Sequence, residues 1–230
     1  MMDARAAEPA EDSTALREAV IATARAMNEH GINVNKAGNV SVRCRRGVHD
    51  GLLVTPSGVA YDALAPESLV FVRQADGVPI GRLAPSSEWR FHRDILASRR
   101  EFGAIVHTHS PAATALACHG VGLPAFHYMV AAAGGADIRC APYATFGTQA
   151  LSDHALQALA DRRACLLAHH GVIACGEDPA DALALAIEVE HLARIYLQAR
   201  VLGEPPRLPQ DEIQRVLQKF VRYGRARSGD

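Results

Sequence analysis

Two histidines, His107 and His109, lie two residues apart at the end of an apolar run over residues 103–106. Side chains two apart on a β-strand leave the same face, about 6.6 Å apart at a rise of roughly 3.3 Å per residue. Two imidazoles on one face can bind one metal ion, and imidazole is the commonest metal ligand in proteins. Ser110-Pro111 follows directly, and a hydroxyl N-cap before proline predicts a helix start. We therefore expect the pair at the carboxyl end of a strand.

A second histidine pair, His169-His170, follows the apolar run over residues 164–168. Three imidazoles with one coordination position left open are typical of a catalytic zinc site. Adjacent residues on a strand face opposite sides, so only one of His169 and His170 is expected to join the first pair. The spacing does not choose between them. The alternative is two unrelated histidine clusters at strand ends.

Glu88 is the best candidate for a catalytic carboxylate. It follows Ser86 and Ser87 at an expected helix start, where free N–H groups and hydroxyls favour anion binding. Helix capping and the helix dipole also favour a glutamate in a first turn, so its position alone does not establish catalysis. The loop over residues 36–39 and the turn Ser57-Gly58 offer further amide donors, although neither is a Walker motif.

The hydrophobic pattern predicts the elements that would position these groups. Helices are expected over residues 13–30, 86–98, 111–119, 127–133, 152–161, 179–202 and 211–220, and strands over 40–42, 51–54, 68–72, 103–109, 138–140 and 164–168. The sequence contains no internal repeat or linker. We therefore predict one α/β domain of the α+β type over residues 13–230, with a mainly antiparallel central sheet flanked by helices. Residues 1–12 are expected to be a disordered extension.

The composition narrows the class of protein. The chain has 230 residues, of which 49% are hydrophobic and 21% charged, with a net charge of −1, as in soluble globular proteins. Binding to nucleic acid or to a membrane surface needs a basic excess that is absent here. No run is long enough for a membrane span, and the acidic N-terminus does not resemble a targeting peptide. Five scattered cysteines without CxxC spacing indicate reduced thiols and a cytoplasmic protein.

Eight stretches of the sequence together resemble the class II aldolase and adducin family. They are Ala37-Gly38-Asn39-Val40-Ser41, Thr55-Pro56-Ser57-Gly58, Pro85-Ser86-Ser87-Glu88-Trp89-Arg90-Phe91-His92, His107-Thr108-His109, His127-Tyr128-Met129, Ala131-Ala132-Ala133-Gly134-Gly135, Ala141-Pro142-Tyr143-Ala144-Thr145-Phe146-Gly147-Thr148 and His169-His170-Gly171. The resemblance extends from the first expected helix to Tyr223. It implies a homotetramer with active sites between subunits and one Zn²⁺ per subunit.

The resemblance also implies roles for individual residues. Three histidines fall on the zinc ligands: His107, His109 and His170. Glu88 falls on the catalytic acid and base, which also occupies the fourth metal position at rest. Tyr128 falls on a tyrosine that a neighbouring subunit contributes to handle the hydroxyl proton, and Tyr223 falls on a C-terminal tyrosine near the same site.

The two ends of the substrate are also implied by the resemblance. Six residues fall on the phosphate pocket: Gly38, Asn39, Ser57, Gly58, Ser86 and Ser87. Phe146 and Phe220 would line the aldehyde end. Lys36 is a departure, because the position looks like threonine in a family enzyme with similar motifs. We expect Lys36 to add a charge-assisted contact to the substrate phosphate.

The expected activity is reversible cleavage of a deoxy-ketose 1-phosphate to dihydroxyacetone phosphate and a small aldehyde. L-Fuculose 1-phosphate, which gives L-lactaldehyde, is the first choice, and 5-deoxy- or 5-methylthio-pentulose 1-phosphates are the alternatives. The enediolate that cleavage leaves needs an electron sink, either a metal or a lysine Schiff base. Lys36 and Lys219 are the only lysines, and neither is placed like a buried amine, which favours the metal. Less favoured readings are a pentulose-5-phosphate 4-epimerase and a non-catalytic, adducin-like interaction module.

Overall fold

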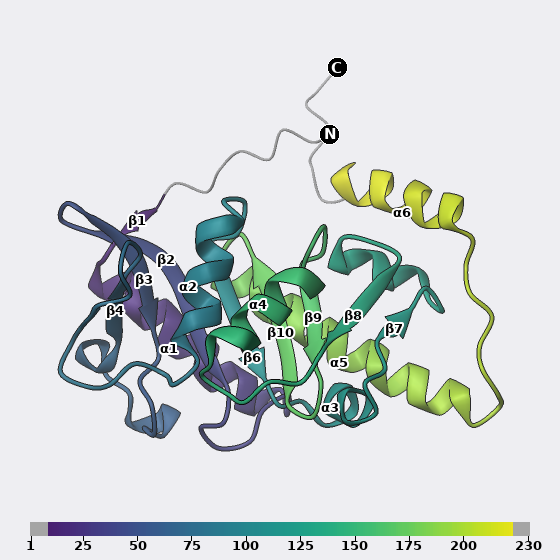
Figure 1. The fold of residues 1–230 in the computed structure, drawn as a ribbon, viewed down its shortest axis with the longest axis horizontal. Coiled ribbons are helices and arrows are strands. Elements are labelled where there is room, and N and C mark those ends of the chain that lie inside the picture. The colour runs from purple at the N-terminus through teal and green to yellow at the C-terminus, as the bar shows by residue number, and fades with distance from the viewer. Residues whose placement is uncertain (1–8, 223–230) are drawn as a thin grey trace.

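A ten-stranded, mainly antiparallel sheet runs through residues 9–222, the part of the chain that this computed structural model describes (Figure 1). The strand order is β5-β4-β3-β2-β6-β10-β9-β8-β7, and β1 pairs with β2. The strands are β1 (Ala10–Glu11), β2 (Asn39–Arg46), β3 (His49–Val54), β4 (Val70–Arg73), β5 (Pro79–Ile80), β6 (Ala104–Thr108), β7 (Leu123–Pro124), β8 (Asp137–Ala141), β9 (Ala164–Leu167) and β10 (Gly171–Gly176). Two pairs, β1 with β2 and β8 with β9, are parallel. The predicted fold class is confirmed.

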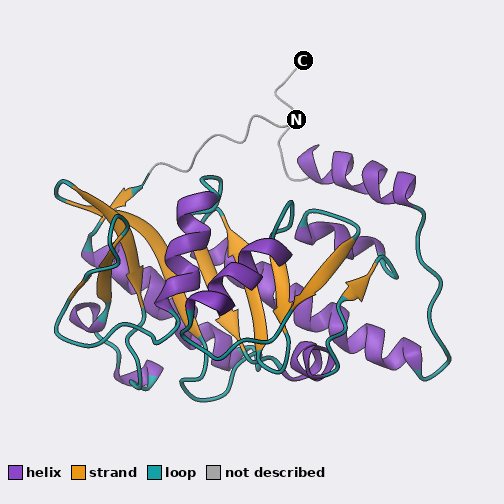
Figure 2. Ribbon diagram, in the orientation of Figure 1, coloured by secondary structure: helices purple, strands orange, loops and turns teal. Residues whose placement is uncertain are grey.

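Helices cover both faces of the sheet (Figure 2). They are α1 (Thr14–Glu29), α2 (Trp89–Ser98), α3 (Pro111–Cys118), α4 (Gln149–Ala158), α5 (Pro179–Arg200) and α6 (Gln210–Arg222), with 3₁₀ turns η1 (Tyr61–Ala63), η2 (Pro66–Ser68) and η3 (Tyr128–Ala133). One core joins α1, α3 and α5 to the sheet, and a second core lies under α2 and α4. The α2 and α4 helices cover the near face in Figure 1, whereas α6 lies at one end and packs on η3.

Strand β6 lies in the middle of the sheet, between β2 and β10, and both neighbours run antiparallel to it. Its side chains alternate between the two cores, since Val106 packs toward α5 and Ile105 packs toward α2 and α4. His107, two residues after Ile105, therefore faces the α2 side of the sheet. Asn39 of β2 and Ile173 of β10 are its neighbours across the ladder.

Strand β10 is the main element that the sequence pattern did not predict. It spans Gly171–Gly176, is fully buried, and consists half of glycine and alanine, which favour strands only weakly.

The expected helix over residues 127–133 is the 3₁₀ helix η3. The expected disorder of residues 1–12 is wrong for Ala10–Glu11, which pair with β2, while residues 1–8 lie outside the described part.

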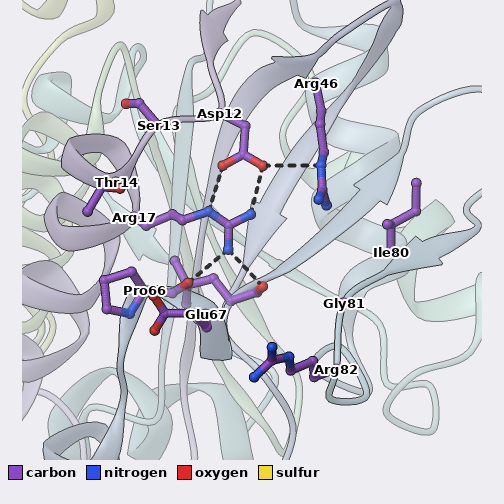
Figure 3. Close-up of a pocket in the computed structure, with 11 residues that line it drawn as sticks. Asp12, Ser13, Thr14, Arg17, Arg46, Pro66, Glu67, Ile80, Gly81 and Arg82 are labelled. Atoms are coloured by element: carbon purple, nitrogen blue, oxygen red, sulfur yellow. Dashed lines mark hydrogen bonds and ion pairs between the residues drawn. The ribbon is translucent and has the colours of Figure 1, made fainter.

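The ordered N-terminal segment is fixed by Arg17, in a polar pocket of about 450 Å³ (Figure 3). Arg17 donates to both carboxylate oxygens of Asp12, at 2.6 and 2.7 Å, and to the carbonyl oxygens of Pro66 and Leu69, at 2.8 and 3.1 Å. All three nitrogens of the guanidinium are thus used within the fold. Through these bonds Arg17 joins α1 to the segment around η2.

Two further findings bear on the expectations from composition. All five cysteines are free, as expected for reduced thiols. Over the described residues, no helix combines the length and apolar character that crossing a membrane requires.

Candidate metal centre

Four side chains from separate parts of the chain converge at the end of β6: Glu88, His107, His109 and His170. Their potential ligand atoms all lie within 4.8 Å of one another. The Nε2 atoms of His107 and His109 are 3.0 Å apart, and the ring centroids of His107 and His170 are 4.9 Å apart. The structure thus brings together the four residues expected at a metal centre.

The turn between β9 and β10 decides which of two adjacent histidines joins this cluster. Strand β9 ends at Leu167, so His169 and His170 lie in a turn, where strand alternation does not apply. His169 has a φ of 55°, in the left-handed region. Its ring lies edge-on to Tyr143, 6.0 Å away, whereas the ring of His170 faces the cluster. His170 is therefore the candidate ligand.

Close backbone packing fixes the strands that carry the cluster. A Cβ on Gly171 would lie 2.3 Å from the carbonyl oxygen of Thr108, and one on Gly38 would lie 2.4 Å from that of His107. Any side chain at these two positions would push the neighbouring strand away. Both glycines thus allow the approach of β2 and β10 to β6 on which the cluster depends.

The hydrogen bond of the His107 ring orients its free nitrogen. Nδ1 lies 2.8 Å from the carbonyl oxygen of Val172 on β10. A carbonyl oxygen only accepts, so Nδ1 carries the proton and the lone pair of Nε2 faces the cluster. Such a backbone contact to the second ring nitrogen is the usual support for a metal-ligating histidine.

Glu88 is the N-cap residue of α2, but its side chain does not cap the helix. The carboxylate is 5% exposed and turns toward the histidines, with Oε2 3.1 Å from Nε2 of His107 and Oε1 3.2 Å from Nε2 of His170. Asn39 donates its amide N–H to Oε2 at 3.0 Å, while Oε1 is buried without a hydrogen-bond partner. A buried carboxylate oxygen of this kind is suited to a cation or a transferable proton.

Electrostatics favour an ionised carboxylate at Glu88 and neutral imidazoles at His109 and His170. Burial opposes ionisation of Glu88, but the charges of His107 and His170 and the hydrogen bonds of His107 and Asn39 outweigh burial and hold its pKa well below the usual range. Burial lowers the pKa of both His109 and His170 to about 4. Burial also acts on His107, but Glu88 raises its pKa. Three imidazoles and one carboxylate form a donor set that fits Zn²⁺.

A cavity of about 270 Å³ adjoins the cluster. Besides Glu88, His109 and His170, its lining consists of Ala37, Ser87, Tyr143, Ala144, Phe146 and His169. Phe146 is thus beside the centre, as expected for a residue at the aldehyde end. The volume suits a small molecule rather than a polymer.

The segments expected to bind phosphate lie side by side next to the centre. Nζ of Lys36 donates to the carbonyl oxygen of Gly58 at 2.7 Å. The backbone N–H of Ser57 donates to the carbonyl oxygen of Ala84 at 3.0 Å. Ser87 lines the cavity, whereas Ser86 is buried and accepts from the N–H of Glu88 at 3.3 Å.

Two other predicted residues do not reach the cavity of their own chain. Tyr128 is half exposed in η3 and is not among the lining residues. Phe220 on α6 packs against the small core around Ile213. Tyr223 lies outside the described residues.

His92 is a polar residue near the centre for which no role was predicted. It is fully buried on α2 and hydrogen-bonds Asn39 and Ser41 on β2. The available signal was its position four residues after Glu88, which places both side chains on one face of the helix.

Comparisons with known proteins agree with this geometry. The family model described as "Class II Aldolase and Adducin N-terminal domain" matches residues 18–197. A 5-methylthioribulose-1-phosphate/5-deoxyribulose-1-phosphate aldolase of Rhodospirillum rubrum is 54% identical, over 91% of this chain and 93% of that protein. L-Fuculose phosphate aldolase of Escherichia coli K12 is 47% identical, over 91% and 95%. A solved structure of L-fuculose 1-phosphate aldolase superposes with a TM-score of 0.86 at 36% identity, covering 91% of this chain and 97% of that one.

Proposed function

The chain belongs to the class II aldolase and adducin family, and on that premise we propose that it is a zinc-dependent aldolase acting on ketose 1-phosphates. The observation that carries the proposal is the cluster of three histidines and Glu88 beside a cavity with room for a small molecule. An interaction module of the adducin type has no need for these groups. The reaction belongs to carbohydrate metabolism, and a cytoplasmic location remains our prediction.

Each group near the centre has a chemical task in this proposal. Cleavage of the carbon–carbon bond leaves the enediolate of dihydroxyacetone phosphate, and a Zn²⁺ ion bound by His107, His109 and His170 would supply a Lewis acid for its charge. Glu88 would transfer a proton at the enediolate carbon through Oε1, the oxygen without a hydrogen-bond partner. Amides and hydroxyls of the segments around Gly38, Ser57 and Ser87 would bind the phosphate.

The aldehyde half of the substrate is the finer part of the proposal. The name of the relative at 54% identity supports 5-methylthio- or 5-deoxyribulose 1-phosphate, and the name of the relative at 47% supports L-fuculose 1-phosphate. The lining of the cavity includes Ala144 and Phe146, whose apolar side chains suit a methyl or methylthio group. We therefore propose the pentulose 1-phosphates as the preferred substrates.

A substrate panel tests this choice. Cleavage of 5-deoxyribulose 1-phosphate, 5-methylthioribulose 1-phosphate and L-fuculose 1-phosphate would be followed by coupled reduction of the released dihydroxyacetone phosphate. We expect the highest kcat/KM for a pentulose 1-phosphate. A higher value for L-fuculose 1-phosphate would reverse the assignment, and cleavage of none would contradict the proposed activity.

Oligomeric state is also part of the proposal. We propose a homotetramer in which Tyr128 of one subunit completes the site of its neighbour, because this tyrosine is half exposed and does not line its own cavity. Tyr223 and Phe220 would contribute from the C-terminal segment. The two variants Tyr128→Phe and Glu88→Gln, each impaired alone, are then expected to regain activity when unfolded and refolded together. Mixed tetramers that regain no activity would contradict active sites shared between subunits.

Lys36 provides a test of the phosphate end. In the structure its ammonium donates to the carbonyl oxygen of Gly58, in the turn expected to bind phosphate. Lys36→Thr is expected to raise KM for dihydroxyacetone phosphate about tenfold and leave kcat unchanged, because a charge-assisted hydrogen bond contributes about 1.5 kcal/mol. Lys219→Thr, which changes the exposed lysine of α6, is the matched control. An unchanged KM in Lys36→Thr would show that Lys36 only joins the two loops.

A further inference from the structure

Four buried polar side chains form a continuous chain of hydrogen bonds that ends at Glu88. The order is Ser41, His92, Asn39 and Glu88. Oγ of Ser41 lies 2.7 Å from Nδ1 of His92, Nε2 of His92 is in hydrogen-bond contact with Oδ1 of Asn39, and Nδ2 of Asn39 lies 3.0 Å from Oε2 of Glu88. These residues are 0 to 5% exposed, so water does not compete for the bonds.

The spacing of the four residues matches a helix packed on a strand. Glu88 and His92 are four apart, so they share one face of α2. Asn39 and Ser41 are two apart on β2, so both point to the α2 side, as His107 does from the neighbouring strand. The packing of α2 on β2 therefore brings Glu88 and His92 within hydrogen-bond distance of Asn39 and Ser41.

Donor and acceptor capacities fix the direction of every bond in the chain. The carboxylate of Glu88 only accepts, so Asn39 must point its amide nitrogen at Glu88 and its oxygen at His92. An amide oxygen also only accepts, so His92 must carry its proton on Nε2. A neutral imidazole then has an acceptor at Nδ1, to which the hydroxyl of Ser41 donates. Burial, which lowers the pKa of His92 to about 3, keeps this ring neutral.

We propose that His92 is a positioning residue that fixes the orientation of the Asn39 amide and, through it, the catalytic carboxylate of Glu88. If the amide were reversed, its oxygen would face the carboxylate and repel it. His92 opposes this reversal, because its Nε2–H binds the amide oxygen and a reversed amide would require the ring to change to its Nδ1–H tautomer. The proposal rests on the proposed function for the catalytic role of Glu88, but not for the hydrogen-bond directions.

The chain also distinguishes the two oxygens of Glu88. Oε2 accepts from Asn39 and remains an acceptor as long as the amide keeps its orientation. Oε1 has no hydrogen-bond partner and borders the side of the carboxylate that faces His170. The positioning by His92 therefore directs proton transfer to Oε1. Loss of His92 would reduce the rate of the proton-transfer step.

The test compares His92→Leu, which removes both ring nitrogens, with His92→Gln, whose amide can donate near the position of Nε2. We expect His92→Leu to lower kcat for hydrogen exchange of dihydroxyacetone phosphate about 10- to 100-fold, as loss of a residue that supports a metal ligand does, with bound zinc unchanged. His92→Gln is expected to restore most of kcat. Ile95→Val, another buried change on α2, is the control and should retain the wild-type rate.

A double-mutant cycle tests whether His92 acts through Asn39. In an Asn39→Ala background, His92→Leu is expected to cause no further loss of kcat. An equal loss in both backgrounds, a wild-type kcat in His92→Leu, or a loss of zinc from that variant would each overturn the proposal. If His92→Leu does not fold, Ser41→Ala takes its place, with a smaller loss that Asn39→Ala again abolishes; an undiminished kcat would overturn the proposal.

A measurement on the metal-free protein separates this proposal from the proposed function. In ¹⁵N spectra of histidine-labelled apoprotein, assigned with His92→Gln, the His92 ring is expected as the neutral Nε2–H tautomer. Asn39→Ala should weaken that preference. The Nδ1–H tautomer in wild type would overturn the proposal even in an active enzyme. If wild type does not catalyse exchange, the proposed function fails, and the tautomer alone decides the hydrogen-bond directions and with them the proposal.

Discussion

Glu88→Gln is expected to bind zinc and to lose hydrogen exchange at the hydroxyl-bearing carbon of dihydroxyacetone phosphate, by about 10²- to 10⁴-fold. Glutamine has nearly the same shape but cannot take up and return a proton. His107, His109 and His170 remain, and three imidazoles suffice for a catalytic zinc site. The measurement is proton exchange followed by NMR, with zinc content determined on the same sample.

The zinc content of the Glu88→Gln protein distinguishes the two roles proposed for this residue. Loss of exchange with zinc retained is expected for an acid and base that is only an additional ligand at rest. Loss of zinc would assign Glu88 mainly to metal binding. Wild-type exchange in this variant would contradict its catalytic role, because the amide offers no alternative path for the proton.

The second large effect is expected at the adjacent histidines of the β9–β10 turn. His170→Asn is expected to lower zinc affinity more than the loss of a residue that only hydrogen-bonds a ligand, which typically costs roughly 10- to 100-fold, because it removes a direct ligand. His169→Asn is the matched control with the same chemical change one residue earlier. Asparagine also tolerates the left-handed conformation of His169, so the turn should be preserved.

Zinc affinity of both variants can be measured by competition with a chromogenic chelator. We expect wild-type affinity for His169→Asn, with an altered KM because His169 lines the cavity. The reverse result, weak binding by His169→Asn and normal binding by His170→Asn, would mean that the turn adopts another conformation. Wild-type zinc affinity in both variants would place neither histidine on the metal.

The sequence predicted most of the fold because its helices and strands carry strong local signals. The α5 helix begins at Asp178-Pro179 with a side-chain cap from Asp178, and β6 begins with three apolar residues, Ala104, Ile105 and Val106. Strand β10 has no comparable signal, because half of its residues are glycine or alanine. Its position beside β6 results from long-range pairing, which a local pattern does not encode.

The site was predicted less completely than the fold, for reasons that are local in each case. Alternation along a strand could not choose between His169 and His170, because both lie in a turn. Glu88 was ambiguous because a glutamate in the first turn of a helix usually stabilises the helix, and only the structure shows that its side chain turns to the histidines. His92 was overlooked because a lone histidine on an apolar helix face looks like core.

In the proposed homotetramer, part of the aldehyde end and of the subunit interface would come from a second copy of the chain. Tyr128 is exposed on η3, and Phe220 belongs to a small core with α6, so neither contacts the centre of its own subunit. Their proposed roles follow from the family resemblance and require a second copy of the chain. The refolding experiment with mixed subunits is therefore the test for this part.

The central claim is metal-dependent enediolate chemistry at the cluster of Glu88, His107, His109 and His170. Its most direct test is hydrogen exchange of dihydroxyacetone phosphate in deuterated water without any aldehyde, because it does not depend on the second substrate. We expect stereospecific exchange at the hydroxyl-bearing carbon that stops on chelation and returns with added Zn²⁺. Absence of exchange in protein that contains one zinc ion per chain would contradict the account.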